Sequence, residues 1–88
     1  MKGYEMLPEH MRESARAYVE VGRPPGSFLR AVLTNDLIES FGRADHINQQ
    51  CMFGWATWLY NECPGNAWGS PEAVEAWIAR GGLEGDAT

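Results

Sequence analysis

Apolar residues recur at helical spacing along most of the chain, and the segment 47–62 is the most apolar stretch of this pattern. On a helix of 3.6 residues per turn, one face of this segment carries Ile47, Cys51, Trp55, Trp58 and Leu59. The opposite side carries Phe53, Ala56 and Tyr60. A helix that is apolar on both sides is usually buried between other elements. The pattern therefore predicts a central helix whose second face is either core or a binding surface.

Two further amphipathic helices have clear boundaries. One is predicted over 8–21, because apolar residues share one stripe there and Gly22 is a typical C-terminal stop. The other is predicted over 71–80, where Ser70 precedes a proline and an acid in the order that favours a helix start. Each of these helices offers one apolar stripe to the central helix.

The segment 27–42 allows two interpretations that differ in the role of Asp36. On a continuous helix Asp36 falls inside the apolar arc, and a buried carboxylate is costly unless it is hydrogen-bonded. A break at Thr34-Asn35-Asp36 removes this cost, with Thr34 or Asn35 capping a second short helix. We favour the break near Asn35. The short helix after it carries Leu37, Ile38 and Phe41.

The predicted fold is therefore all-α, a compact four-helix single domain formed by residues 1–82. Its helices are expected at 8–21, 27–42, 45–62 and 71–80, with Asp45 capping the third. Trp68 and Trp77 are expected to close over the central helix, and residues 83–88 to form a disordered tail. The sequence shows no internal repeat and no convincing strand.

Charge and composition narrow the choice of partner. Twelve acidic against seven basic residues give a net charge of −5. Direct nucleic-acid binding normally needs a dense basic patch, whereas the arginines here are scattered, so we expect no direct nucleic-acid partner. An acidic surface instead suits a basic protein partner. No apolar run approaches the roughly 20 residues of a membrane span, and no signal-peptide core is present, so we expect an intracellular protein without a membrane partner.

Residues with catalytic or metal-binding chemistry do not form a recognised constellation. His10, His46, Cys51 and Cys63 match no zinc-binding spacing, so we expect no metal and no cofactor. Cys51 is expected to be a buried free thiol, with a disulfide to Cys63 as the alternative. Acidic pairs at helical spacing are typical of solvated faces, and so short a chain has little room for a substrate pocket. We predict that the protein is not an enzyme and has no catalytic residues.

Two blocks of sequence resemble short proteins of unassigned function that bacteriophages and prophages encode. The first block is Pro24-Pro25-Gly26-Ser27-Phe28-Leu29-Arg30-Ala31-Val32-Leu33 followed by Asn35-Asp36-Leu37. The second is Trp58-Leu59-Tyr60-Asn61-Glu62 with Pro64, then Trp68-Gly69-Ser70-Pro71-Glu72 with Trp77. The resemblance covers residues 7–80. It implies a phage accessory role in the cytoplasm of a bacterial host and supplies no catalytic residues.

The leading functional expectation is a small acidic phage protein that binds and modulates or inhibits a bacterial host protein complex. Inhibitors of host defence, including the anti-CRISPR type, belong to this class, and a negative surface can act as a DNA mimic. The expected partner-binding residues are two aromatics of the central helix, three acids of the first helix and the acid at the break: Phe53, Tyr60, Glu9, Glu13, Glu20 and Asp36.

Two alternatives differ in kind from this expectation. The first is a small helical DNA-binding regulator of phage genes that uses Arg43, Asn48, Gln49 and Gln50. The second is a phage structural or assembly protein that forms a homodimer or larger homo-oligomer through its spare aromatic surface.

Overall fold

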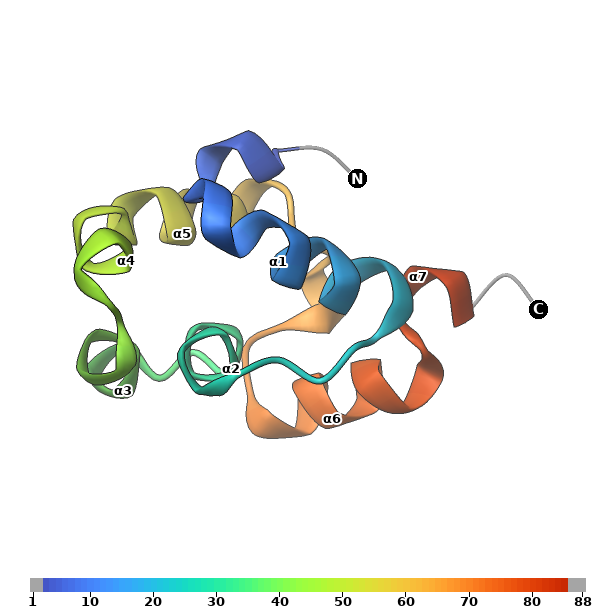
Figure 1. Cartoon of the computed structure of the whole chain (residues 1–88). Helices are drawn as coiled ribbons and strands as arrows, with labels where there is room; N and C mark the ends of the chain where they lie inside the picture. The colour runs from blue at the N-terminus through green and yellow to red at the C-terminus, as the bar shows by residue number, and fades with distance from the viewer. Residues whose placement is uncertain (1–2, 86–88) are drawn as a thin grey trace.

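The computed structural model describes residues 3–85, and helices follow one another through this range (Figure 1). The described residues contain no strand, which confirms the all-α class. Residues 3–85 form seven α-helices instead of the predicted four, because two predicted helices are broken and a short one is added at the end. They are α1 (Glu9–Val21), α2 (Ser27–Leu33), α3 (Leu37–Arg43), α4 (His46–Gln50), α5 (Met52–Asn61), α6 (Pro71–Arg80) and α7 (Gly82–Gly85), with 3₁₀ turns η1 (Tyr4–Met6) and η2 (Gly65–Ala67).

Helices α1 and α6 lie close to their predicted positions, and their ends show why. After α1, Gly22 adopts the left-handed φ of 73°, and its N–H donates to the carbonyl of Tyr18 at 3.0 Å. Before α6, the hydroxyl of Ser70 accepts a hydrogen bond from the N–H of Ala73 at 3.1 Å. Local capping chemistry therefore sets both boundaries.

The predicted break near Asn35 is confirmed, and Asp36 is its cap. Asn35 has a φ of 65°, so the helical path stops between α2 and α3. The Asp36 carboxylate accepts the N–H of Glu39 at 3.1 Å and begins α3. The capping residue is thus neither Thr34 nor Asn35. Asp36 is exposed, so the alternative of a buried carboxylate is wrong.

The predicted continuous helix over 45–62 is wrong, because the chain turns at Cys51. The N–H of Cys51 donates to the carbonyl of Asn48, three residues back, at 3.1 Å. This tighter turn rotates α4 relative to α5. Ile47 is therefore 53% exposed and Cys51 is half-buried, so neither belongs to the buried face that the pattern predicted. The predicted cap is confirmed, since the Asp45 carboxylate accepts the N–H of Asn48 at 2.7 Å.

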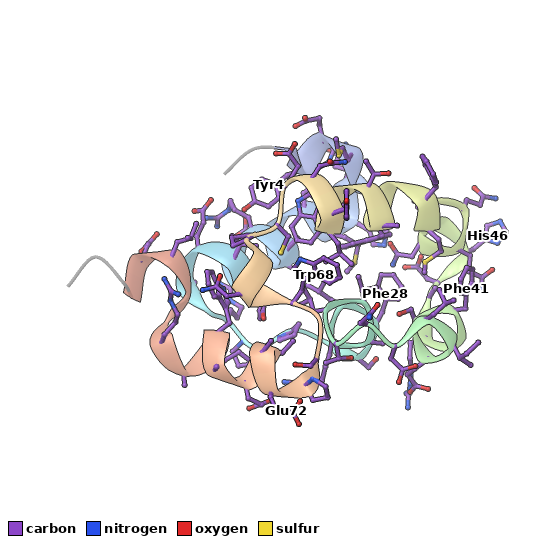
Figure 2. The ribbon with its side chains drawn as sticks, turned by 180° about the vertical axis from the view of Figure 1, so that it is seen from behind. Tyr4, Phe28, Phe41, His46, Trp68 and Glu72 are labelled. Atoms are coloured by element: carbon purple, nitrogen blue, oxygen red, sulfur yellow. The ribbon has the colours of Figure 1, made fainter. Side chains whose placement is uncertain are left out.

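Aromatic side chains from separate helices form the centre of the core. The rings of Trp55 and Trp58 lie nearly perpendicular, with centroids 6.0 Å apart, and Phe28 meets Trp55 edge-on at 5.3 Å. Such tilted pairs suit the charge distribution of aromatic rings. Figure 2 shows Phe28 on α2 and Trp68 on the loop before α6, on the inner side of the ribbon. Trp68 is half-buried and packs against the core.

Hydrogen bonds to buried aromatic groups join α1 to the C-terminal half of the chain. The Tyr18 hydroxyl donates to the carbonyl of Ala67 at 2.6 Å. The Trp77 indole N–H donates to the carbonyl of Tyr18 at 3.0 Å. Since all three residues are buried, these bonds fix α6 and η2 against α1.

The helical region continues past residue 82. Helix α7 packs on α1, and a Cβ on Gly82 would lie 2.6 Å from the backbone nitrogen of Gly22. Residues 83–85 therefore belong to a helix and not to the predicted tail over 83–88. Residues 86–88 lie outside the described range.

Candidate protein-binding site

An apolar groove of about 370 Å³ lies between α3 and α5. It exists because α3 packs mainly against α2 and leaves the facing side of α5 uncovered. Figure 2 shows Phe41 on the side of α3 that faces α4 and α5. The groove is lined by residues of α2, the α2–α3 turn, α3 and α5, namely Val32, Asn35, Asp36, Leu37, Ser40, Phe41, Met52, Phe53, Trp55, Ala56 and Leu59.

Large apolar side chains are exposed on two of the helices that line this groove. Their exposed fractions are 86% for Phe53, 83% for Tyr60, 81% for Ile38, 64% for Leu37 and 46% for Phe41. We call these five residues the apolar rim. The first two belong to α5 and the other three to α3. The second face of the central helix, which the sequence left as either core or surface, is therefore surface.

The same helix that supplies the rim also supplies the floor of the groove. Trp55, Trp58 and Leu59 of α5 point inward and are buried, while Phe53 and Tyr60 lie on its outer side. Trp55 is only 1% exposed and still lines the groove. Its indole N–H donates to the side-chain oxygen of Asn48 at 3.1 Å. This bond holds the floor in one orientation.

The groove and rim carry almost no net charge. Helix α5 contains no charged residue. On α3, the Arg43 guanidinium donates to the Glu39 carboxylate at 2.8 Å, so these two charges compensate each other. Asp36 is the one acid on the groove lining. The buried Ser40 hydroxyl donates to the carbonyl of Asp36 at 2.6 Å, which leaves no unpaired hydroxyl donor in the wall.

The three acids predicted on the first helix do not line the groove. Arg16 stands between two of them, and its guanidinium donates to Glu13 and to Glu20, the latter at 3.0 Å. The hydrogen bond from Arg16 lowers the pKa of the Glu13 carboxyl. Glu9 is exposed near the start of α1. The structure therefore places Phe53 and Asp36 in the groove wall, Tyr60 beside it, and the α1 acids elsewhere.

The residues that the DNA-binding alternative requires do not form one exposed surface. Asn48 is buried, and its side chain is engaged by Trp55. Arg43 is paired with Glu39. Gln49 and Gln50 are exposed on the short helix α4. A recognition surface that needs Asn48 to point outward is inconsistent with this arrangement.

His10 and the two cysteines occupy structural positions in the fold. His10 on α1 contacts the Asp45 carboxylate at 2.9 Å, a contact that sequence reasoning missed because 35 residues separate the two. The Asn48 backbone N–H and this histidine lower the pKa of Asp45. Cys51 and Cys63 are free, and burial raises the pKa of the Cys63 thiol to about 12. Within residues 3–85, no three His, Cys, Asp or Glu side chains are grouped to hold a metal ion.

Comparisons of the chain with protein-family models, curated proteins and solved structures found no significant match. Among the helices of the described range, none combines the length and apolar character needed to cross a membrane.

Proposed function

We propose that this protein is a non-enzymatic binding module that attaches to a bacterial host protein through the groove and the apolar rim. The observation that carries the proposal is the contrast within α5. Trp55 and Trp58 are fully covered, whereas Phe53 and Tyr60 on the same helix are left almost fully in solvent. Contiguous apolar patches of this kind on soluble proteins typically mark interaction sites.

The extent of the exposed surface favours a protein over a small ligand. The groove volume of about 370 Å³ is near the lower limit for small-molecule pockets, about 300–1,000 Å³. Ile38 and Tyr60 lie outside the groove lining, so a ligand that fills the groove leaves both in water. A partner with an apolar surface covers the groove and rim together. Asp36 on the groove lining favours a cationic side chain at the matching position of that partner.

The resemblance to phage and prophage proteins supplies the biological setting of the proposal. In that setting the protein modulates or inhibits a host complex in the bacterial cytoplasm, and a host-defence complex of the anti-CRISPR type is one target. The geometry supports recognition by the apolar rim better than DNA mimicry by α1. Arg16 compensates charge between Glu13 and Glu20, so α1 lacks an uninterrupted row of negative charge.

The proposal is tested by capturing the host protein with tagged copies of this protein and then reconstituting the complex from the purified components. The partner is identified by mass spectrometry, purified, and titrated against the wild type and the Phe53→Ser/Tyr60→Ser variant. We expect at least about 30-fold weaker binding for this variant, since central aromatic contacts contribute about 2 kcal/mol or more. Both side chains are exposed, so the free energy of unfolding should change by about 0.5 kcal/mol or less per site.

The matched control is Val21→Ser/Leu83→Ser, which removes two partly exposed apolar side chains outside the groove, 42% and 38% exposed. It should bind like the wild type. Equal binding by the rim variant and this control refutes the proposed site. Unfolding of the rim variant shows that Phe53 and Tyr60 serve the fold, and also refutes it.

A further inference from the structure

We infer that in the free protein the apolar rim and groove are covered by the same face of a second copy, so that the chain forms a two-fold dimer. The inference concerns the protein without its host partner and goes beyond the proposed function. It rests on the amount of apolar surface, its shape and its charge.

The apolar area is at the upper end of the range for a free monomer and supplies most of what one side of a dimer interface needs. At roughly 150–250 Å² for a large side chain, the five rim residues expose on the order of 600 Å² together. The largest apolar patch on a typical monomer is about 300–600 Å². A standard stable interface buries about 800 Å² on each partner, and the groove walls and their margin add to the rim.

The face carries both a projecting side chain and a recess, which a two-fold interface can use together. In such an interface the same patch is used twice, so a projection must lie beside a recess that accepts it. Phe53 projects from α5 at 86% exposure, directly at the edge of the groove. The groove holds about 370 Å³, more than twice the roughly 150 Å³ of an apolar cavity that binds benzene. The groove therefore has enough volume to accept the phenyl ring of a second copy.

Charge favours contact through this face over contact elsewhere. With a net charge of −5, two copies repel each other when their acidic surfaces meet. The acids of α1 and α6 lie outside the groove lining, among them Glu9, Glu72 and Glu75. Helix α5 has no charge and the charges of Glu39 and Arg43 on α3 compensate each other. Asp36 is the one acid on the groove lining, so each copy brings a single negative charge to the contact, and two copies meet here with less electrostatic repulsion than through the acids of α1 and α6.

Dimer formation and host binding use the same residues and exclude each other. A host protein would bind the monomer, and its apparent affinity would fall as the fraction of dimer rises. The dimer thus keeps the rim out of water until a partner competes for it.

Sedimentation equilibrium of the purified full chain, from low to high micromolar concentration, tests the dimer without any partner. We expect the mass to rise from the 9.8 kDa of one chain toward twice that value. Phe53→Ser should weaken the dimer at least about 30-fold, and Ile38→Glu should do the same by placing a charge in the apolar contact. Val21→Ser, outside the face, should leave the association unchanged. Circular dichroism shows whether each variant keeps its helices.

A wild type that stays at the mass of one chain throughout overturns the inference. A dimer that persists in folded Phe53→Ser and in folded Ile38→Glu overturns it as well, since another face would then form the contact. These outcomes are separate from the proposed function. A monomeric wild type that binds its host protein through Phe53 leaves that function standing, and a dimer for which no such binding occurs leaves only the present inference.

Discussion

At the scale of single residues, Asn48 shows how a buried polar group can position the floor of a surface groove. Its side-chain oxygen accepts the indole N–H of Trp55, and its own backbone N–H donates to Asp45 at 2.7 Å. A buried polar group without a partner costs about 1–3 kcal/mol, so these bonds make the burial tolerable. By holding Trp55, Asn48 fixes the floor of the groove between α3 and α5.

Cys63 gives a prediction about alkaline pH. Burial raises the pKa of its thiol from 9.0 to about 12. Because the folded-state pKa is the higher one, the neutral thiol contributes stability below pH 9, and this contribution is lost as pH rises from 9 toward 12. Each pH unit in that window should cost up to about 1.4 kcal/mol.

The measurement is urea unfolding between pH 8 and pH 11 for the wild type and for Cys63→Ala, with the slope of stability against pH compared. The variant should lose less stability over this window, although its starting stability is lower because a packed sulfur is removed. Cys51→Ala, which changes the half-buried thiol, is the matched control. Identical slopes for the wild type and Cys63→Ala would show that the Cys63 thiol is not buried as described.

The sequence raised the question whether Phe53 and Tyr60 are exposed, but it could not answer that question. Helical spacing separates their face from that of Trp55 and Trp58. Which face is covered depends on how near α3 approaches α5, and no local pattern contains that distance. The sequence held one weaker indication that part of this surface is exposed. Leu37, Ile38 and Phe41 lie within one seven-residue helix, and side chains at these three positions cannot all face the same neighbouring helix.

At the scale of elements, boundaries were predictable where capping chemistry sets them. Ser70 and Gly22 mark the ends of α6 and α1 in the sequence and in the structure. The turn at Cys51 was not predictable, because neither proline nor glycine marks it and an Asn48–Trp55 bond accompanies it. The turn changes which residues of α4 are buried. The pattern therefore placed Ile47 inside, whereas the fold buries Asn48.

Gly54 within α5 is required by a close approach of η1, and this gives a prediction at the same scale. A Cβ at this position would lie 2.8 Å from the backbone carbonyl oxygen of Met6. In an open helix Gly→Ala stabilises by about 1 kcal/mol. Gly54→Ala should instead destabilise by about 1–3 kcal/mol, because the carbonyl must move.

Gly42→Ala is the matched control, since it lies in α3 and an added Cβ meets nothing within 4 Å. It should stabilise by up to about 1 kcal/mol. Chemical denaturation of both variants measures the difference. If Gly54→Ala is as stabilising as Gly42→Ala, η1 does not rest on α5 in the way described.

At the scale of the whole molecule, the charge distribution separates a protein-binding module from a DNA-binding regulator. The net charge of −5 is spread over several helices, and Arg16, Arg30 and Arg43 each pair with an acid. Phosphate contacts need free cationic side chains, and their number sets the salt dependence of binding. Because their charges are compensated, Arg16, Arg30 and Arg43 do not supply the free cationic side chains that phosphate contacts need.

We therefore expect no binding to a fluorescently labelled DNA duplex at low salt, where electrostatic binding is strongest. Fluorescence anisotropy measures this directly. Arg43→Ala/Gln49→Ala is the informative variant should any binding appear. Association that weakens steeply with salt and is lost in this variant would support the regulator and contradict the expectation.

Trp55 gives the molecule a built-in optical reporter. Its indole is buried in the core and also forms part of the groove lining, so an occupant of the groove changes the polarity of the surroundings of this ring. The emission of an indole follows the polarity of its surroundings, and a protein or a second copy on this face therefore changes the fluorescence of Trp55. The other three tryptophans, Trp58, Trp68 and Trp77, do not line the groove, so their emission forms the background against which the change is read. Occupancy of the groove can thus be followed without a label, at concentrations far below those that sedimentation requires.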